Sequence, residues 1–158
     1  MIRRSFVVMA LCVALSPLLC IADTRFEGKT IAVLDGDTID VLTQDKQKIR
    51  IRLANIDAPE KSQAFGQRSR QNLASMVAGK SVEVIDTGGD QYGRRVGRVL
   101  IAGTEVNVEQ VRAGYAWVYV RYNHDGRLPA LEAAARQEGL GLWVDAHPQA
   151  PWLYRHSR

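Results

Sequence analysis

Three acidic side chains stand beside apolar, strand-like stretches where packing gives no reason for a carboxylate. Asp37 follows the apolar run 31–34, and Asp57 and Glu60 end the alternating run 48–56. Carboxylates gathered at strand ends repel one another, which costs free energy unless a cation or a proton offsets their charge. A hard divalent cation held by oxygen ligands is the usual way to offset it. With arginines nearby, such a cluster suits the chemistry of phosphate esters.

The spacing of these residues allows Asp37 and Asp57 to bind one cation together. If the two strands form a hairpin, residues whose numbers sum to about 92 face each other. Asp37 then lies opposite Asn55, and Asp57 follows two positions later. Diagonal neighbours in such a pair are about 7–8 Å apart, a distance at which two carboxylates can share a metal ion. Pro59 disfavours helix at Ala58, which leaves the Ala58 carbonyl available as a further ligand.

Other interpretations of the acidic residues remain beside this one. Asp35 and Gly36 form a pair that is common in plain turns. An EF-hand loop starting at Asp35 is excluded, because Asp40 and Lys46 stand where glycine and glutamate are needed. Aspartyl-phosphate phosphatases also place two aspartates one residue apart after an apolar strand. They need a larger parallel α/β domain, and the alternating helices are missing here, so this class is kept as an alternative.

The order of the predicted elements is typical of a small barrel. Ile49, Ile51 and Leu53 alternate with polar residues, which indicates a half-buried strand. Pro129 suits the first turn of one helix, and Asn107 is placed to cap another. The predicted strands are 28–34, 38–42, 48–56, 81–86 and 95–101, and the predicted helices are 67–78, 107–114 and 129–139. We therefore predict a β-barrel with helices (α+β), a five-stranded barrel of the oligonucleotide-binding type (OB-fold) with three α-helices.

The first 22 residues are typical of a signal peptide. Two arginines precede the apolar run 6–15, and small side chains near Ala22 and Asp23 suit cleavage there. The apolar run is too short to span a bilayer comfortably. Both cysteines of the chain fall inside this segment, so the mature protein has no disulfide. We expect a secreted or periplasmic protein that has no membrane association once the signal peptide is removed.

The remaining chain is long enough for one domain with a single core. We assign residues 23–145 to that domain and residues 146–158 to a C-terminal tail. The tail has no periodic pattern, and we expect it to be loosely packed or disordered. The two arginines of the signal peptide supply half of the formal net charge of +4, so any affinity for polyanions must come from local arrangement. Nothing in the pattern indicates more than a monomer.

Three motifs of the chain resemble those of the staphylococcal nuclease (thermonuclease) family. They occur in the order and at the spacing of that family, at residues 35–38, 52–60 and 90–94. Asn107 with Gly114, and the end of the last helix at 139–143, extend the resemblance over nearly all of the mature chain. The resemblance implies a five-stranded OB-fold barrel with three helices. It also implies a calcium-dependent endo- and exonuclease that hydrolyses DNA and RNA at the bond between phosphorus and the 5′ oxygen, leaving 3′-phosphate ends.

The resemblance also implies a calcium site. Carried over by position, Asp37 and Asp57 would bind Ca²⁺ directly, and the backbone carbonyl of Ala58 would be the third protein ligand. Asp35 would support the site through water. In the best-known family pattern a threonine stands where this chain has Ala58, a change of little consequence if only the carbonyl is used.

Catalytic and substrate-binding residues follow from the same resemblance. Glu60 would orient or deprotonate the attacking water, and Arg52 and Arg94 would grip the scissile phosphate. Tyr92 and Tyr122 would contact the substrate. Strict alternation along one strand places Arg52 on the face opposite to the aspartate five residues later, so a bulge or the coiling of the barrel must bring the two together.

A non-catalytic nucleic-acid-binding module on the same barrel is a further alternative, because related domains can lose their catalytic residues. A degenerate module would lack some of the residues that do the chemistry. The five that matter most are all present: Asp37, Arg52, Asp57, Glu60 and Arg94. This favours the enzyme.

Overall fold

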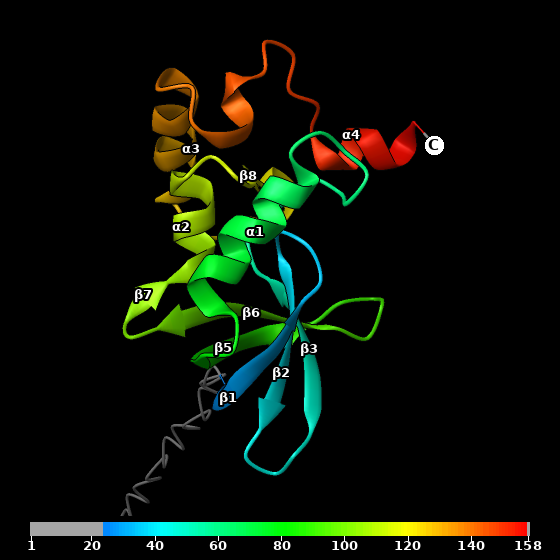
Figure 1. Ribbon diagram of the computed structural model, residues 1–158, viewed down its shortest axis with the longest axis vertical. Helices are drawn as coiled ribbons and strands as arrows, with labels where there is room; N and C mark the ends of the chain where they lie inside the picture. Colours follow the sequence, from blue (N-terminus) through cyan, green and yellow to red (C-terminus); the bar gives the residue numbers. More distant parts are fainter. Residues whose placement is uncertain (1–23, 158) are drawn as a thin grey trace, which may run out of the picture.

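The structure, a computed structural model, describes residues 24–157 and contains both strands and helices (Figure 1). The predicted signal peptide lies outside the described residues. The strands are β1 (Thr24–Val33), β2 (Thr38–Thr43), β3 (Lys48–Leu53), β4 (Ile56–Asp57), β5 (Ser81–Gly89), β6 (Arg95–Ile101), β7 (Thr104–Glu105) and β8 (Trp117–Val118). The helices are α1 (Gly66–Val77), α2 (Val106–Arg112), α3 (Leu128–Gln137) and α4 (Pro151–His156), with short 3₁₀ turns η1 (Val120–Tyr122) and η2 (Gly141–Val144).

Five of the strands close into a barrel. Antiparallel pairings give the strand order β3-β2-β1-β5-β6-β7, and β3 also pairs in parallel with β6. This last pairing joins the two sides of the sheet. The register shifts between Thr30 and Ala32 in β1 and between Asp86 and Gly88 in β5, and such irregularities bend strands. The five-stranded OB-fold barrel of the α+β class is thereby confirmed.

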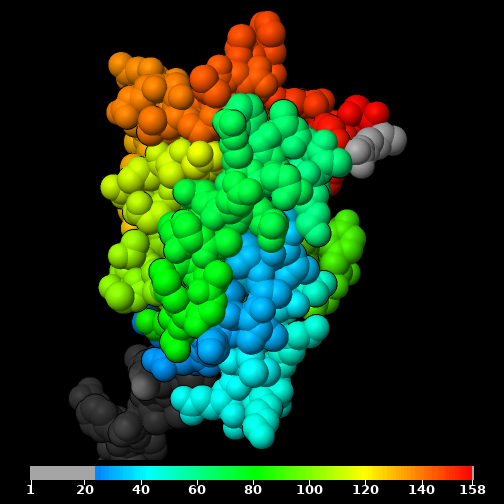
Figure 2. All heavy atoms as spheres, in the orientation of Figure 1, coloured from blue at the N-terminus to red at the C-terminus, as the bar shows by residue number. Residues whose placement is uncertain are grey.

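The barrel interior is filled by branched apolar side chains that alternate with outward-facing ones. Ile39 and Ile51, from β2 and β3, are fully buried, and Leu73 of α1 and Val106 of α2 join the same cluster. Figure 1 shows α1 lying along the barrel beside β1, with α2 and α3 grouped at one end. In Figure 2, α1 and β1 form a continuous surface on this face. The apolar faces of the strands and helices therefore share one core.

The register of the β2–β3 hairpin differs by two residues from the predicted one. Thr38 pairs with Arg52. Asp37 therefore lies opposite Leu53, whose N–H donates to the Asp37 carbonyl at 2.8 Å, and not opposite Asn55. Turn geometry sets the register of a hairpin, and the turn here is centred one residue earlier than the alternation of apolar residues predicts.

The three predicted helices are present, but Asn107 has a different role from the predicted cap. Glu105 occupies the N-cap position of α2. Asn107 is buried in the first turn of this helix, where its side chain accepts a hydrogen bond from the Val99 N–H at 2.9 Å and donates to the carbonyls of Ala54 and Gly97 at 2.9 and 3.2 Å. It ties α2 to the barrel. Within residues 24–157, no helix has the length and apolar character needed to cross a membrane.

The C-terminal segment is packed, so the expectation of a loose or disordered tail is wrong. Ala150 and Pro151 are buried at the start of α4. The Gln63 side chain donates a hydrogen bond to the Gln149 carbonyl at 2.6 Å, and Trp152 packs on a second apolar cluster. Figure 1 shows α4 lying beside the segment that leads into α1. These contacts join residues far apart in the sequence, which periodicity does not reveal.

Candidate active site

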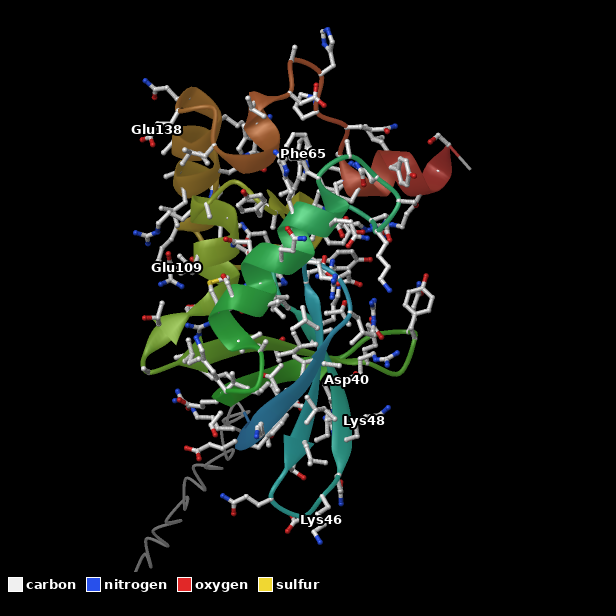
Figure 3. All side chains as sticks on the ribbon, in the orientation of Figure 1. Asp40, Lys46, Lys48, Phe65, Glu109 and Glu138 are labelled. Carbon is white, nitrogen blue, oxygen red and sulfur yellow. The ribbon has the colours of Figure 1, made fainter. Side chains whose placement is uncertain are left out.

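All of the residues that the sequence singles out line one cleft. The cleft has a volume of about 1650 Å³ and lies between the β1–β2 turn, the chain around β4, the β5–β6 loop, η1 and α4. Its predicted members are Asp35, Asp37, Arg52, Asp57, Ala58, Glu60, Tyr92, Arg94 and Tyr122. Asp40 and Lys48, labelled in Figure 3, line its border on the β2–β3 hairpin. Side chains from distant parts of the chain thus share one concave surface.

The turn between β1 and β2 orients the Asp37 carboxylate. Asp35 Oδ1 accepts a hydrogen bond from the Asp37 N–H at 3.0 Å, and the Thr38 hydroxyl donates to Asp37 Oδ1 at 3.0 Å. The Ala58 N–H donates to Asp37 Oδ2 at 2.7 Å, which ties the turn to the chain after β4. Gly36 lies so close to α1 that an added Cβ would be 1.8 Å from a hydroxyl oxygen of that helix. The Asp-Gly-Asp-Thr sequence is therefore a turn that also presents a carboxylate.

Arg52 reaches both aspartates because the strand breaks after Leu53. Asn55 has a positive φ of 69°, and the chain turns there before it continues as β4. Arg52 Nη2 lies 2.9 Å from Asp57 Oδ1, and Nη1 lies 3.2 Å from Asp37 Oδ2. The arginine side chain is 12% exposed. A turn, and not a bulge within one strand, thus removes the conflict that strict alternation predicts.

A third arginine, which the sequence analysis missed, contacts two carboxylates of the cleft. Arg155 Nη2 lies 2.8 Å from Asp57 Oδ2, and Nη1 lies 2.8 Å from Glu60 Oε1. Sequence analysis assigned no role to the tail. The sequence signal for this helix was a proline followed by a tryptophan. Proline suits the first turn of a helix, and tryptophan suits a buried contact.

Arg94 stands on the opposite wall, in the β5–β6 loop. The Asp90 carboxylate accepts hydrogen bonds from the backbone N–H of Tyr92 at 2.9 Å and of Arg94 at 3.0 Å. Arg94 Nε also donates to Asp90 Oδ2 at 2.7 Å, and its guanidinium lies 5.4 Å from the centre of the Tyr92 ring. Although burial acts to raise it, these hydrogen bonds hold the pKa of Asp90 below its ordinary value. Asp90 therefore shapes the loop and aims Arg94.

Aromatic side chains form another part of the cleft. Tyr92 is 73% exposed and Tyr122 is 52% exposed. Tyr119 lies edge-on to Tyr122 and stacks on Trp152, with ring centres 5.6 Å apart and planes 6° apart. Trp117 serves packing, because it is buried in the second apolar cluster. Tyr119 lines the cleft as well.

Two carboxyl groups of the cleft have raised pKa values. Burial and the neighbouring charge of Asp37 raise the pKa of Asp35 to about 6. Burial raises the pKa of Asp57 above its ordinary value, although hydrogen bonds from Arg155 and the charge of Arg52 act in the opposite direction. A carboxyl group whose pKa is raised in this way is one that an added cation would stabilise.

Asp37 and Asp57 fit a hard divalent cation. Their carboxylates face each other closely enough to contact the same Arg52 guanidinium. Within residues 24–157, no group of three or more His, Cys, Asp or Glu side chains is arranged to hold a metal ion. A cation at this position would therefore need oxygen ligands from the backbone, such as the Ala58 carbonyl, and from water. Such mixed oxygen ligation is normal for Ca²⁺ and Mg²⁺.

Fold and site together define a small OB-fold barrel whose cleft combines carboxylates with guanidinium groups. The family model described as staphylococcal nuclease homologue matches residues 50–145, which is more than half of the chain. The chain belongs to the staphylococcal nuclease family, and the resemblance seen in its motifs is confirmed.

Relatives of similar length carry names of the same kind. The chain is 47% identical over 156 residues to an uncharacterized endonuclease of Escherichia coli, covering 98% of this chain and 99% of the relative. It is 43% identical over 143 residues to a micrococcal nuclease of Shigella flexneri, covering 84% and 82%. It is 36% identical over 157 residues to an uncharacterized endonuclease of Haemophilus influenzae, covering 99% and 88%. All three names denote nucleases.

Proposed function

We propose that this protein is a calcium-dependent phosphodiesterase, an endo- and exonuclease that hydrolyses DNA and RNA. It cleaves the bond between phosphorus and the 5′ oxygen and leaves 3′-phosphate products. The observation that carries the proposal is the approach of Asp37 and Asp57 to one guanidinium, that of Arg52, beside Asp35, whose pKa is raised by burial and by the charge of Asp37. Membership of the family and relatives named endonuclease and micrococcal nuclease support nucleic acid as the substrate.

The calcium ligands in this proposal are Asp37, Asp57 and the backbone carbonyl of Ala58, with Asp35 acting through water. Bound Ca²⁺ supplies positive charge against the negative charge that develops on the phosphoryl oxygens. Asp35 accepts the hydrogen bond of the Asp37 N–H, and the Ala58 N–H bonds the Asp37 carboxylate. These contacts keep the ligand carboxylate in one orientation before an ion arrives.

Glu60 orients or deprotonates the attacking water, and either role needs only hydrogen-bond reach to that water. Arg52 and Arg94 bind the scissile phosphate from two walls of the cleft. A guanidinium can form two parallel hydrogen bonds with phosphate, which lysine does not reproduce. Arg52 pairs with Asp37 and Asp57, which supports a position beside the proposed cation, where the phosphate would lie.

Tyr92 and Tyr122 contact the nucleotides next to the scissile bond. Both rings line the cleft and remain largely exposed. Stacking of a base on an aromatic ring contributes about 1–3 kcal/mol and depends little on sequence. Such stacking is compatible with both DNA and RNA as substrates.

Export and a monomeric state are part of the proposal. Residues 1–22 carry the composition of a signal peptide, which supports a mature protein that acts outside the cytoplasm. The proposal takes this mature protein to be a monomer. Expression of the complete chain followed by mass measurement of the extracytoplasmic protein tests this. An intact N-terminus on that protein would contradict it.

The decisive experiment incubates the mature protein with plasmid DNA and with RNA, in Ca²⁺ or in EDTA. We expect cleavage of both polymers with Ca²⁺ and none with EDTA. The products should carry 3′-phosphate, which makes them resistant to extension by a polymerase until a phosphatase removes it. Asp37→Asn is the matched variant and should lose Ca²⁺-dependent cleavage. Binding of DNA without cleavage in any divalent cation would refute the proposal.

A further inference from the structure

Helix α4 brings an arginine into the cleft from outside the region that the family model matches. That match ends at residue 145, whereas Arg155 lies in the last turn of α4. The helix is held by buried Pro151 and by Trp152, whose ring stacks on Tyr119 at 5.6 Å. Tertiary packing thus determines where Arg155 lies.

The Arg155 guanidinium joins two carboxylates with different proposed roles. Nη1 donates to Glu60 Oε1 at 2.8 Å and to Asp57 Oδ1 at 3.2 Å, and Nη2 donates to Asp57 Oδ2 at 2.8 Å. The three hydrogen bonds use both terminal nitrogens of the guanidinium. A planar group that bonds two carboxylates at once restricts the position of each relative to the other.

Glu60 depends on this contact more than Asp57 does. The Asp57 side chain is 2% exposed, belongs to β4 and is also bound by Arg52. The Glu60 side chain is 38% exposed and follows β4 in a segment without regular structure. Within residues 24–157, Arg155 is the one basic side chain that pairs with Glu60. Without that partner, the three rotatable bonds of this glutamate would sample several rotamers.

We propose that Arg155 is a positioning residue of the active site. It holds the Glu60 carboxylate in the orientation that directs the attacking water, and it thereby makes α4 part of the catalytic unit. The inference rests on the proposed function. A displacement of about 1 Å in a reacting group can cost about 10²-fold in rate, so a hydrogen bond that orients a water-directing carboxylate has a measurable effect on turnover.

Two other roles for Arg155 make different predictions. If the residue only anchors α4, its loss lowers the melting temperature and leaves kcat unchanged. If it only competes with the cation for Asp57, its loss strengthens Ca²⁺ binding and raises activity. The positioning role alone lowers kcat without a matching change in Ca²⁺ affinity.

The test compares Arg155→Gln and Arg155→Lys with the wild type, using a single-stranded oligonucleotide that carries a fluorophore and a quencher. At saturating Ca²⁺ we expect kcat of Arg155→Gln to fall about 10- to 100-fold, the usual effect of losing an orienting partner. We expect KM to change by less than about threefold, because substrate contacts remain. Arg155→Lys should recover part of the rate, since its charge reaches one carboxylate.

Two controls separate orientation from stability and from metal binding. Arg112→Gln removes an exposed arginine that pairs with Glu109 on α2 at 3.4 Å, and it should leave kcat and KM unchanged. Calorimetry on the substrate-free variants should show no loss of Ca²⁺ affinity, because removing the positive charge of Arg155 beside Asp57 does not weaken cation binding. In a Glu60→Gln background, Arg155→Gln should have no further effect on kcat, because residues that act through one another are not additive.

The outcomes distinguish the inference from the proposed function. A wild type that never cleaves refutes the proposed function. If the wild type cleaves and Arg155→Gln has the kcat of the wild type, the positioning role is refuted. It is also refuted if Arg155→Gln lowers kcat by the same factor in the Glu60→Gln background as in the wild type. A higher kcat with tighter Ca²⁺ binding refutes it as well. If Arg155→Gln does not fold at the assay temperature, Arg155→Lys provides the test instead. A kcat of Arg155→Lys equal to that of the wild type would then contradict the inference.

Discussion

At the scale of single residues, the four carboxylates around the proposed cation site outnumber the guanidinium groups in contact with them. The carboxylates are those of Asp35, Asp37, Asp57 and Glu60, and the guanidinium groups in contact with them are those of Arg52 and Arg155. Four carboxylates and two guanidinium groups leave an excess of two negative charges, which is the charge that one divalent cation neutralises. Burial is the main cause of the raised pKa values of Asp35 and Asp57, and the neighbouring charge of Asp37 raises both further.

Replacing Asp35 with asparagine should stabilise the cation-free protein at neutral pH. The pKa of Asp35 in the folded state is about 6, above the ordinary 3.8. The stability linked to the protonated group is therefore present below pH 3.8 and is lost as the pH rises through 6. At pH 8, where the charge is costly, Asp35→Asn should raise the free energy of unfolding by about 1–2 kcal/mol, less than the full shift implies because the group is partly solvated.

Denaturant unfolding in EDTA measures this effect at high and low pH. Near pH 4 the variant and the wild type should differ little, and added Ca²⁺ should narrow the difference at pH 8. An equal stabilisation at both pH values would contradict the raised pKa.

Arg94→Ala should lower turnover by at least about 10²-fold, because one donor to a developing oxyanion is worth that much. Arg95→Ala is the matched control, since the Arg95 side chain pairs with Asp86 at 2.8 Å, and it should keep its turnover. Steady-state cleavage rates measure both, with circular dichroism to verify the fold. Unchanged turnover of Arg94→Ala at full Ca²⁺ loading would show that Arg94 does not bind the scissile phosphate.

At the scale of elements, local patterns predicted which segments are strands and helices, but not how they meet. Ile49, Ile51 and Leu53 alternate with polar residues, which indicates a strand with one buried face. This pattern is sufficient to predict β3. The register of the hairpin depends on the turn at Lys46, which has a positive φ of 59° and lies at the tip labelled in Figure 3. The break at Asn55 depends on another backbone angle. Neither angle follows from hydrophobic periodicity.

Gly36→Ala should destabilise the protein, because α1 packs directly on the β1–β2 turn. An added Cβ would lie 1.8 Å from Ser69 Oγ and 2.7 Å from Ala58 Cβ, so the helix or the turn must move. Such overpacking costs about 1–3 kcal/mol. Gly126→Ala is the matched control, since nothing lies within 4 Å of its added Cβ. Thermal unfolding of both variants measures the difference, and equal melting temperatures would contradict the close packing.

At the scale of the whole molecule, the sequence predicted the barrel and most of the site, and it missed the end of the chain. The OB-fold and the cleft residues follow from strand patterns and from three motifs. The docking of α4 follows from contacts between residues almost a hundred positions apart, such as Arg155 with Asp57. Short amphipathic segments carry little periodicity, so only the folded barrel, which presents Tyr119 to Trp152, shows where α4 lies.

The charge distribution of the whole molecule predicts a modest salt dependence of nucleic-acid binding. Basic side chains along the cleft are largely paired with carboxylates: Arg50 with Asp40 at 2.8 Å and Arg127 with Asp125 at 2.6 Å. A guanidinium that stays paired with a carboxylate does not bind a phosphate and therefore releases few of the counterions around the nucleic acid. With about three phosphate contacts, the logarithm of the affinity for single-stranded DNA should fall against the logarithm of the salt concentration with a slope of about −2.

Fluorescence anisotropy of a labelled oligonucleotide with the Glu60→Gln variant in Ca²⁺ measures this slope, because that variant should keep calcium and lose cleavage. Asp40→Asn provides the contrast: it releases Arg50 from its partner and should steepen the slope by about 0.7, the contribution of one more phosphate contact. A slope steeper than about −5 would mean that the paired arginines exchange their carboxylates for phosphates along the whole cleft. An affinity independent of salt would leave stacking on the aromatic wall as the source of binding and would remove the arginines from phosphate recognition.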